Sequence, residues 1–72
     1  MKPHLFIFAM YNPFDGTNKL YQITAWTAIE AVKEGFEGDV NCSFYSSVEE
    51  AKDYYANADY LLSDVIMVKE VL

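Results

Sequence analysis

The stretch HLFIFAMYNPFDGTNKLYQITAW, residues 4–26, decides the fold because it predicts a β-hairpin. Both alternating sets of residues 4–11 are apolar, with Leu5, Ile7, Ala9 and Tyr11 on one side and Phe6, Phe8 and Met10 on the other. A strand of this kind is covered on both faces and typically lies in the centre of its sheet. The Asn-Pro and Asp-Gly pairs within residues 12–18 are typical of a tight turn. Renewed alternation in residues 19–26 completes the hairpin.

Two helices are expected after the hairpin, and the same signal introduces each. Thr27 and Glu30 fit a capping box, in which the hydroxyl and the carboxylate bond to amides of the first turn. Ser47 and Glu50 repeat this pattern, and apolar residues follow both pairs at helical spacing. The first helix is predicted to end at Gly38.

Two further strands are expected in residues 40–46 and 64–72. Val40, Cys42 and Phe44 alternate with polar residues, which predicts a half-buried strand with these three side chains inward. The second segment is apolar on both sides over most of its length.

The predicted order is therefore β-β-α-β-α-β in a single domain, residues 1–72. Right-handed crossovers place both helices on one face of a four-stranded mixed sheet, which is an α+β two-layer sandwich. The other face would then meet water although the first strand is apolar on both sides. Either the loops and Trp26 fold over it or another protein covers it. We favour a partner or self-association, because monomers rarely expose a contiguous apolar patch.

The charge of the chain is uneven. The net charge of the chain is −6. The segment from Glu30 to Asp59 has eight acids and two lysines, so its net charge is also −6 and the rest of the chain is neutral. There is no arginine. Nucleic acids and anionic membranes require a basic face, so direct binding to either is not expected.

The location is expected to be cytoplasmic. No segment approaches the ~18 apolar residues of a membrane span, and a strand explains the apolar start better than a signal peptide does. Cys42 is the single cysteine, which excludes an internal disulfide and suits a reducing compartment.

The candidate partner-binding residues are acids of the two predicted helices and aromatic residues near them. They are Glu30, Glu34, Glu37, Asp39, Glu49, Glu50, Asp53, Tyr54, Tyr60 and Phe14. A row of carboxylates can imitate nucleic-acid phosphates and attract a basic cleft, although the same acids also suit a plain solvated surface. Tyr54 and Tyr60 have the composition of binding hot spots or cap the edge of the core. We expect Phe14, at the hairpin tip, to tuck back over the sheet rather than meet a partner.

Catalytic, metal and cofactor sites are not expected. His4, Cys42 and the serines of residues 43–47 lack the positioned base and third group that a nucleophile needs. Neither acid-glycine loop has the regular acids of a calcium site. A chain of 72 residues also leaves little volume for a ligand pocket in its core.

With its acidic stretches AIEAVKEGFEGD and SVEEAKDYY, the chain resembles the small, acidic, arginine-poor proteins that bacteriophages use to disable or redirect host machinery. Targets of such proteins include RNA polymerase, restriction or CRISPR enzymes and DNA-repair enzymes. The resemblance implies a non-enzymatic inhibitor in the host cytoplasm that binds a basic protein surface, either as a DNA mimic or as a plug in a protein groove. The alternative is a structural module that buries its apolar sheet face in a homodimer or larger assembly.

Overall fold

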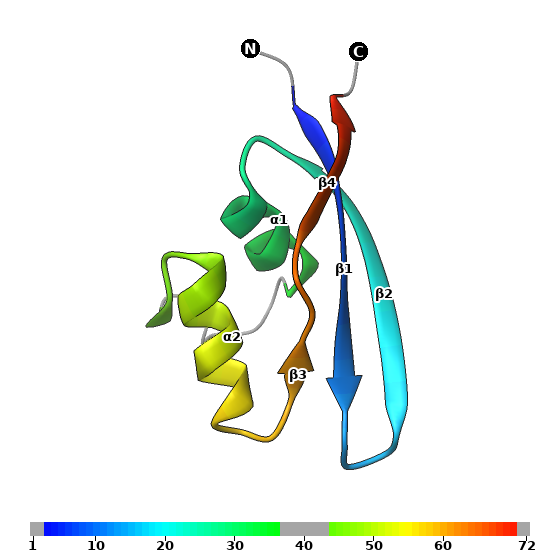
Figure 1. The fold of residues 1–72 in the computed structure, drawn as a ribbon, viewed down its shortest axis with the longest axis vertical. Coiled ribbons are helices and arrows are strands. Elements are labelled where there is room, and N and C mark those ends of the chain that lie inside the picture. The colour runs from blue at the N-terminus through cyan, green and yellow to red at the C-terminus, as the bar shows by residue number, and fades with distance from the viewer. Residues whose placement is uncertain (1–2, 37–43, 71–72) are drawn as a thin grey trace.

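The computed structural model describes residues 3–36 and 44–70 of the chain, and for Lys69 and Glu70 the backbone alone. The elements are β1 (His4–Asn12), β2 (Thr17–Ala25), α1 (Ala28–Gly35), α2 (Val48–Ala56), β3 (Leu61–Leu62) and β4 (Ile66–Glu70). Figure 1 shows the strands as one layer and both helices together on one side of it. The predicted α+β class, a sheet of four strands and the shared helix face are confirmed, although one of the four observed strands was not predicted.

The sheet is antiparallel in every described pairing, so the prediction of a mixed sheet is wrong. Strand β1 lies in the centre, with β2 on one side and β3 and β4 on the other. Parallel strands require a return crossover after each helix. Here α1 and α2 follow one another on the same face, and the described chain re-enters the sheet only at Leu61.

The difference between the predicted mixed sheet and the observed antiparallel sheet arises at residues 40–46, where a strand was predicted. The described part of this segment, residues 44–46, lies outside any strand, and residues 40–43 lie outside the described residues. The predicted inward orientation of Phe44 is also wrong, because Phe44 is 68% exposed whereas Tyr45 is buried at 2%. The other two predicted inward residues, Val40 and Cys42, lie outside the described residues. Tyr45 is held inside by a 2.9 Å hydrogen bond between its hydroxyl and that of Tyr55.

The hairpin forms as predicted, with β1 and β2 in register from His4 opposite Ala25 to Asn12 opposite Thr17. The side chain of Asn12 accepts a hydrogen bond from Phe14 N (2.9 Å), and Gly16 takes a positive φ of 72°. Asp15 Oδ1 accepts bonds from Thr17 Oγ1 (2.6 Å) and Thr17 N (3.0 Å), which lower the pKa of this carboxyl. These bonds close the turn that the sequence pattern indicated.

Both helices begin at the predicted caps. Glu30 N donates to Thr27 Oγ1 (3.3 Å), and Glu50 N donates to Ser47 Oγ (3.2 Å). The Glu50 carboxylate accepts from the backbone N–H of Ser46 (3.2 Å), one residue before the cap. Helix α1 ends at Gly35 with Phe36 as its C-cap, so the prediction that it ends at Gly38 is wrong.

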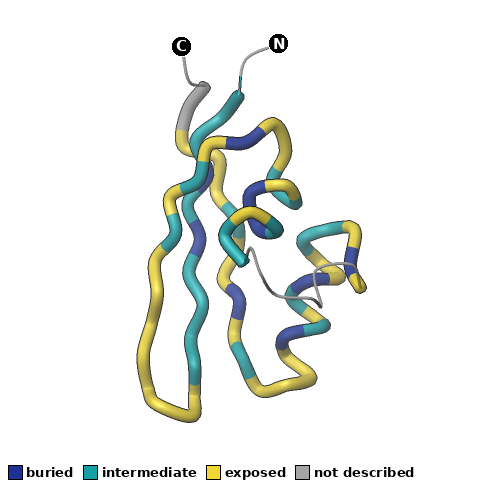
Figure 2. Tube along the Cα trace, turned by 180° about the vertical axis from the view of Figure 1, so that it is seen from behind, coloured by how far each residue is buried: buried dark blue, intermediate teal, exposed yellow. Residues whose placement is uncertain are grey.

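The core lies between the helices and one face of the sheet. Its buried members are Phe6, Phe8, Ala25, Ala31, Val32, Tyr45, Ala51, Tyr55 and Leu62. Figure 2 shows them spread along β1, the helices and β3, whereas the hairpin tip is exposed. Phe8 stacks on Tyr21 at 5.0 Å between ring centroids and meets Phe36 edge to face at 5.9 Å. Aromatic packing therefore supplies much of the contact between sheet and helices.

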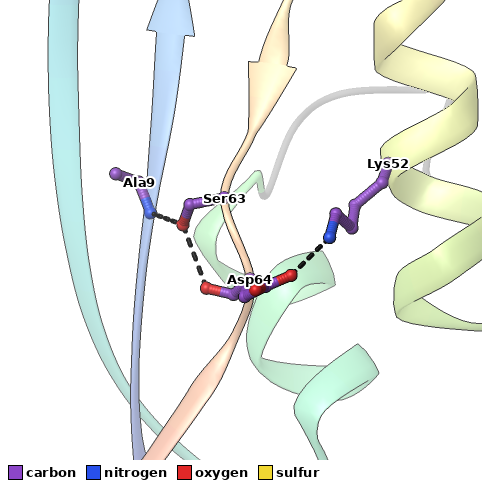
Figure 3. Close-up of polar contacts among 4 residues, drawn as sticks. All are labelled: Ala9, Lys52, Ser63 and Asp64. Atoms are coloured by element: carbon purple, nitrogen blue, oxygen red, sulfur yellow. Dashed lines mark hydrogen bonds and ion pairs between the residues drawn. The ribbon is translucent and has the colours of Figure 1, made fainter.

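A short interruption separates β3 from β4. The strand predicted at residues 64–72 contains β4, whereas β3 was not predicted. Ser63 bridges the interruption, and its backbone N–H donates to Ala9 O (2.9 Å). Its hydroxyl accepts from Ala9 N (2.8 Å) and donates to Asp64 O (3.0 Å) (Figure 3). The adjacent Asp64 forms an ion pair with Lys52 of α2 (Figure 3). These contacts fasten the edge of the sheet to β1 and to α2.

The Lys52–Asp64 ion pair predicts a defined pH dependence of stability. The hydrogen bond from Lys52 lowers the pKa of Asp64 below 3.8, and the same bond raises the pKa of Lys52 above 10.5. The stabilising contribution is therefore complete between these values. It is lost as pH falls below 3.8 through the folded-state pKa of Asp64, and as pH rises above 10.5 through that of Lys52.

Asp64→Asn should lower the melting temperature only slightly, because Asp64 is 81% exposed and solvent screens the ion pair. The decrease should be constant between pH 3.8 and pH 10.5. Thermal unfolding followed by circular dichroism at a series of pH values checks this. The difference from the native chain should narrow in acid and also at high salt. A difference that persists unchanged in acid would show that the ion pair is not its cause.

Candidate interaction surfaces

The predicted acidic residues lie at the outer sides of both helices. Glu30 and Glu34 of α1 are exposed one turn apart, and in α2 the exposed acids are Glu49, Glu50 and Asp53. We call these five the acidic helical surface. The two helices contact one another on the same side of the sheet (Figure 1). Two further predicted members, Glu37 and Asp39, lie outside the described residues.

The lysines beside these acids are engaged elsewhere. Lys52 pairs with Asp64, and this is the one ion pair formed within residues 3–36 and 44–68. The ammonium of Lys33 lies 6.0 Å from the centroid of the Tyr45 ring. Within residues 3–36 and 44–68, Glu50 alone of the five acids accepts hydrogen bonds with its side chain, and they come from Ser46. Lys52 also attracts Glu49 and Asp53 electrostatically, so the described lysines offset the negative charge of the surface only in part and form no ion pair with any of the five acids.

The two predicted anchor tyrosines lie in a row of aromatic rings beside α2. The half-buried Tyr54 ring lies 5.3 Å from that of Tyr55 and 6.0 Å from that of Phe44. Tyr60 is also half-buried and meets Phe14 edge to face at 5.8 Å. Phe14 nevertheless remains 74% exposed, so the prediction that it tucks back is wrong. The hairpin tip is exposed throughout residues 13–16, and the Tyr60 ring covers only part of Phe14.

A groove of about 610 Å³ opens between the hairpin end and α2. Five aromatic residues line it: Tyr21, Phe36, Tyr54, Tyr55 and Tyr60. We call it the tyrosine groove. Asn12, Thr17 and Lys19 supply its polar wall, and Met10 lies beside them. The sequence prediction of little pocket volume concerned the core, whereas this hollow lies at the surface and is formed by three separate segments.

The second face of the sheet is apolar and uncovered within the described residues. Leu20, Leu61 and Ile66 are each at least 60% exposed, and the strand pairing places them opposite Ala9, Tyr11 and Ile7 of β1. We call this the open sheet face. Trp26 is itself 48% exposed. The expectation that loops alone do not cover this face agrees with these exposures.

Across residues 3–36 and 44–68 no group of three or more His, Cys, Asp or Glu side chains could hold a metal ion. None of the described helices has the length and apolar character needed to cross a membrane. Comparison with protein-family models, curated proteins and solved structures gives no match.

Proposed function

We propose that the chain is a non-enzymatic binding protein that inhibits or redirects a nucleic-acid-handling enzyme, such as host RNA polymerase, a restriction or CRISPR enzyme or a repair enzyme. It presents the acidic helical surface to a basic surface of that enzyme. The observation that carries the proposal is the set of five exposed acids on adjacent helices without an ion pair to a described lysine. A bacteriophage origin and action in the host cytoplasm belong to the same proposal.

Electrostatics favours this use over plain solubility. Glu30 and Glu34, like Glu49 and Asp53, are like charges four residues apart on one helix, a spacing that costs about 0.2–0.5 kcal/mol per pair. A basic partner would relieve that repulsion. The resulting attraction raises the association rate more than the lifetime of the complex, and salt screens it.

A second candidate function is a homodimer or assembly module that uses the open sheet face. The exposed Leu20, Leu61 and Ile66 favour it, since large contiguous apolar patches on soluble proteins commonly mark interfaces. A dimer of this kind would resist high salt because apolar burial holds it together.

Two matched triple variants separate these functions. The acidic-surface variant carries Glu34→Gln, Glu49→Gln and Asp53→Asn, which leaves the caps at Thr27 and Ser47 intact. The sheet-face variant carries Leu20→Lys, Gln22→Lys and Thr24→Lys, all at exposed residues of β2. Each raises the net charge from −6 to −3, so differences between them report position rather than total charge.

The tagged proteins are passed through a bacterial lysate at low and high salt, and the retained proteins are identified by mass spectrometry. The acidic-surface variant should retain nucleic-acid-handling enzymes about tenfold less well than the native chain, whereas the sheet-face variant should retain them normally. Unchanged capture by the acidic-surface variant would count against the proposal. A salt-resistant dimer in light scattering that only the sheet-face variant dissociates would favour the second candidate.

A further inference from the structure

Four of the five rings of the tyrosine groove, those of Tyr21, Phe36, Tyr55 and Tyr54, form a continuous series of edge-to-face contacts. The centroids of Tyr21 and Phe36 lie 5.1 Å apart, those of Phe36 and Tyr55 5.2 Å, and those of Tyr55 and Tyr54 5.3 Å. Together these four rings form a wall that joins the hairpin to α2 and presents π-electron density to the groove. Aromatic faces carry partial negative charge, so they attract cations.

Tyr21 shows what kind of group this wall accepts. One face of its ring is stacked on Phe8, with centroids 5.0 Å apart and 9° between the planes. The ammonium nitrogen of Lys19 lies over the ring, 5.2 Å from its centroid, and Lys19 itself lines the groove. Since Phe8 occupies one face, the ammonium takes the other. A cation of the chain's own therefore already occupies an aromatic position in the groove.

From this arrangement we infer that the tyrosine groove is a binding site for a cationic side chain of the partner, above all an arginine, and that Lys19 is its internal competitor. The inference rests on the proposed function, because it assigns the basic partner a specific contact. The net charge of −6 favours a cationic occupant over an anionic one. A guanidinium is planar and weakly hydrated and stacks well on aromatic faces.

An arginine side chain of the partner can displace the Lys19 ammonium from the Tyr21 ring. Lys19 is exposed, and no ion pair or hydrogen bond of its ammonium is among those formed within the described chain. A free ammonium side chain moves into solvent without breaking other contacts. The groove would then offer the exposed face of Tyr21 together with the rings of Tyr54 and Tyr60.

The sign of the Lys19 effect distinguishes a cation from an anion. If the groove accepts cations, removing Lys19 removes a competitor and tightens binding. If it accepts an anionic ligand, Lys19 is the attracting group and its removal weakens binding. Lys33 provides the matched control, since its ammonium also lies over a tyrosine ring, 6.0 Å from the Tyr45 centroid, but it does not line the groove.

The test is a nuclear magnetic resonance titration of the full chain with N-acetyl-arginine amide, followed on the ring protons of Tyr21, Tyr54 and Tyr60. N-acetyl-leucine amide and benzoate serve as the neutral and anionic probes. Lys19→Ala is expected to lower the Kd for the arginine probe about threefold. Lys33→Ala, which changes the net charge equally, should leave it unchanged. Tyr60→Leu should raise it about threefold, and neither other probe should shift the groove resonances.

Several results would overturn the inference: weaker arginine binding by Lys19→Ala, equal effects of Lys19→Ala and Lys33→Ala, benzoate binding at the groove, or no arginine shift. Lys19→Ala replaces an exposed side chain, so loss of folding does not obscure its result. The result of this titration does not decide whether the proposed function is correct. Salt-sensitive capture through the acidic helical surface can persist without arginine binding in the groove, and the groove can bind arginine in a chain that captures no enzyme.

Discussion

Replacing Phe8 with alanine is expected to remove most of the stability of the chain. Phe8 is 2% exposed and packs against both Tyr21 and Phe36 in the core. Truncation of a buried phenylalanine costs about 3–5 kcal/mol through lost transfer free energy and the remaining cavity. A domain of 72 residues has a free energy of unfolding of roughly 4–11 kcal/mol, so the loss is of the same order as the total.

Urea unfolding, followed by tryptophan fluorescence of Trp26 and by circular dichroism, measures this loss. Phe14→Ala is the matched control, because it makes the same chemical change at a side chain that is 74% exposed. That variant should stay within about 0.5 kcal/mol of the native chain. Comparable losses in the two variants would show that Phe8 does not lie in the core.

The parts of the fold that sequence analysis predicted correctly depend on local chemistry. The Asn-Pro and Asp-Gly pairs specify the hairpin turn whatever lies elsewhere, and the bonds of Asn12 and Asp15 follow from them. The caps at Thr27 and Ser47 are local for the same reason. Both helices therefore begin where predicted.

The errors arise where pairing depends on distant residues. Alternation within residues 40–46 suggested a strand, but a short alternating run is a weak signal and no sequence rule states which strand accepts it. The structure instead turns Tyr45 inward to reach Tyr55, ten residues away. The division between β3 and β4 depends on Ser63 meeting Ala9, 54 residues earlier, which no local pattern reveals.

In the candidate site, too, local features were predictable from the sequence and features that combine distant segments were not. Exposure of Glu34, Glu49 and Asp53 follows from helical periodicity once the apolar stripe is known. The tyrosine groove combines the hairpin, the end of α1 and α2, so its volume could not be inferred from any single segment. The one available signal was the placement of Tyr54 and Tyr60 outside the predicted apolar stripe.

The second large effect concerns Gly35, the last residue of α1. A Cβ added there would lie 2.8 Å from Phe8 Cζ and 3.2 Å from Tyr21 Cδ1. Alanine favours a helix over glycine by up to about 1 kcal/mol, and by less at a helix end. Overpacking of a well-filled core costs about 1–3 kcal/mol. The Phe8 ring packs against both Tyr21 and Phe36, so it cannot move away freely, and the steric cost should prevail.

Gly35→Ala is therefore expected to destabilise the native chain by about 1–2 kcal/mol and to become neutral or stabilising once Phe8 is replaced by leucine. Leucine has no atom at the position of Cζ, so the closest contact disappears while the helix preference of alanine remains. Urea unfolding of the native chain, both single variants and the double variant completes the cycle, and the double variant should be more stable than the two separate losses predict. Phe8→Leu retains enough apolar volume to keep all four proteins folded. If Gly35→Ala costs the same stability in both backgrounds, the Phe8 ring moves aside easily. Close packing of α1 on β1 would then not explain why this position requires glycine.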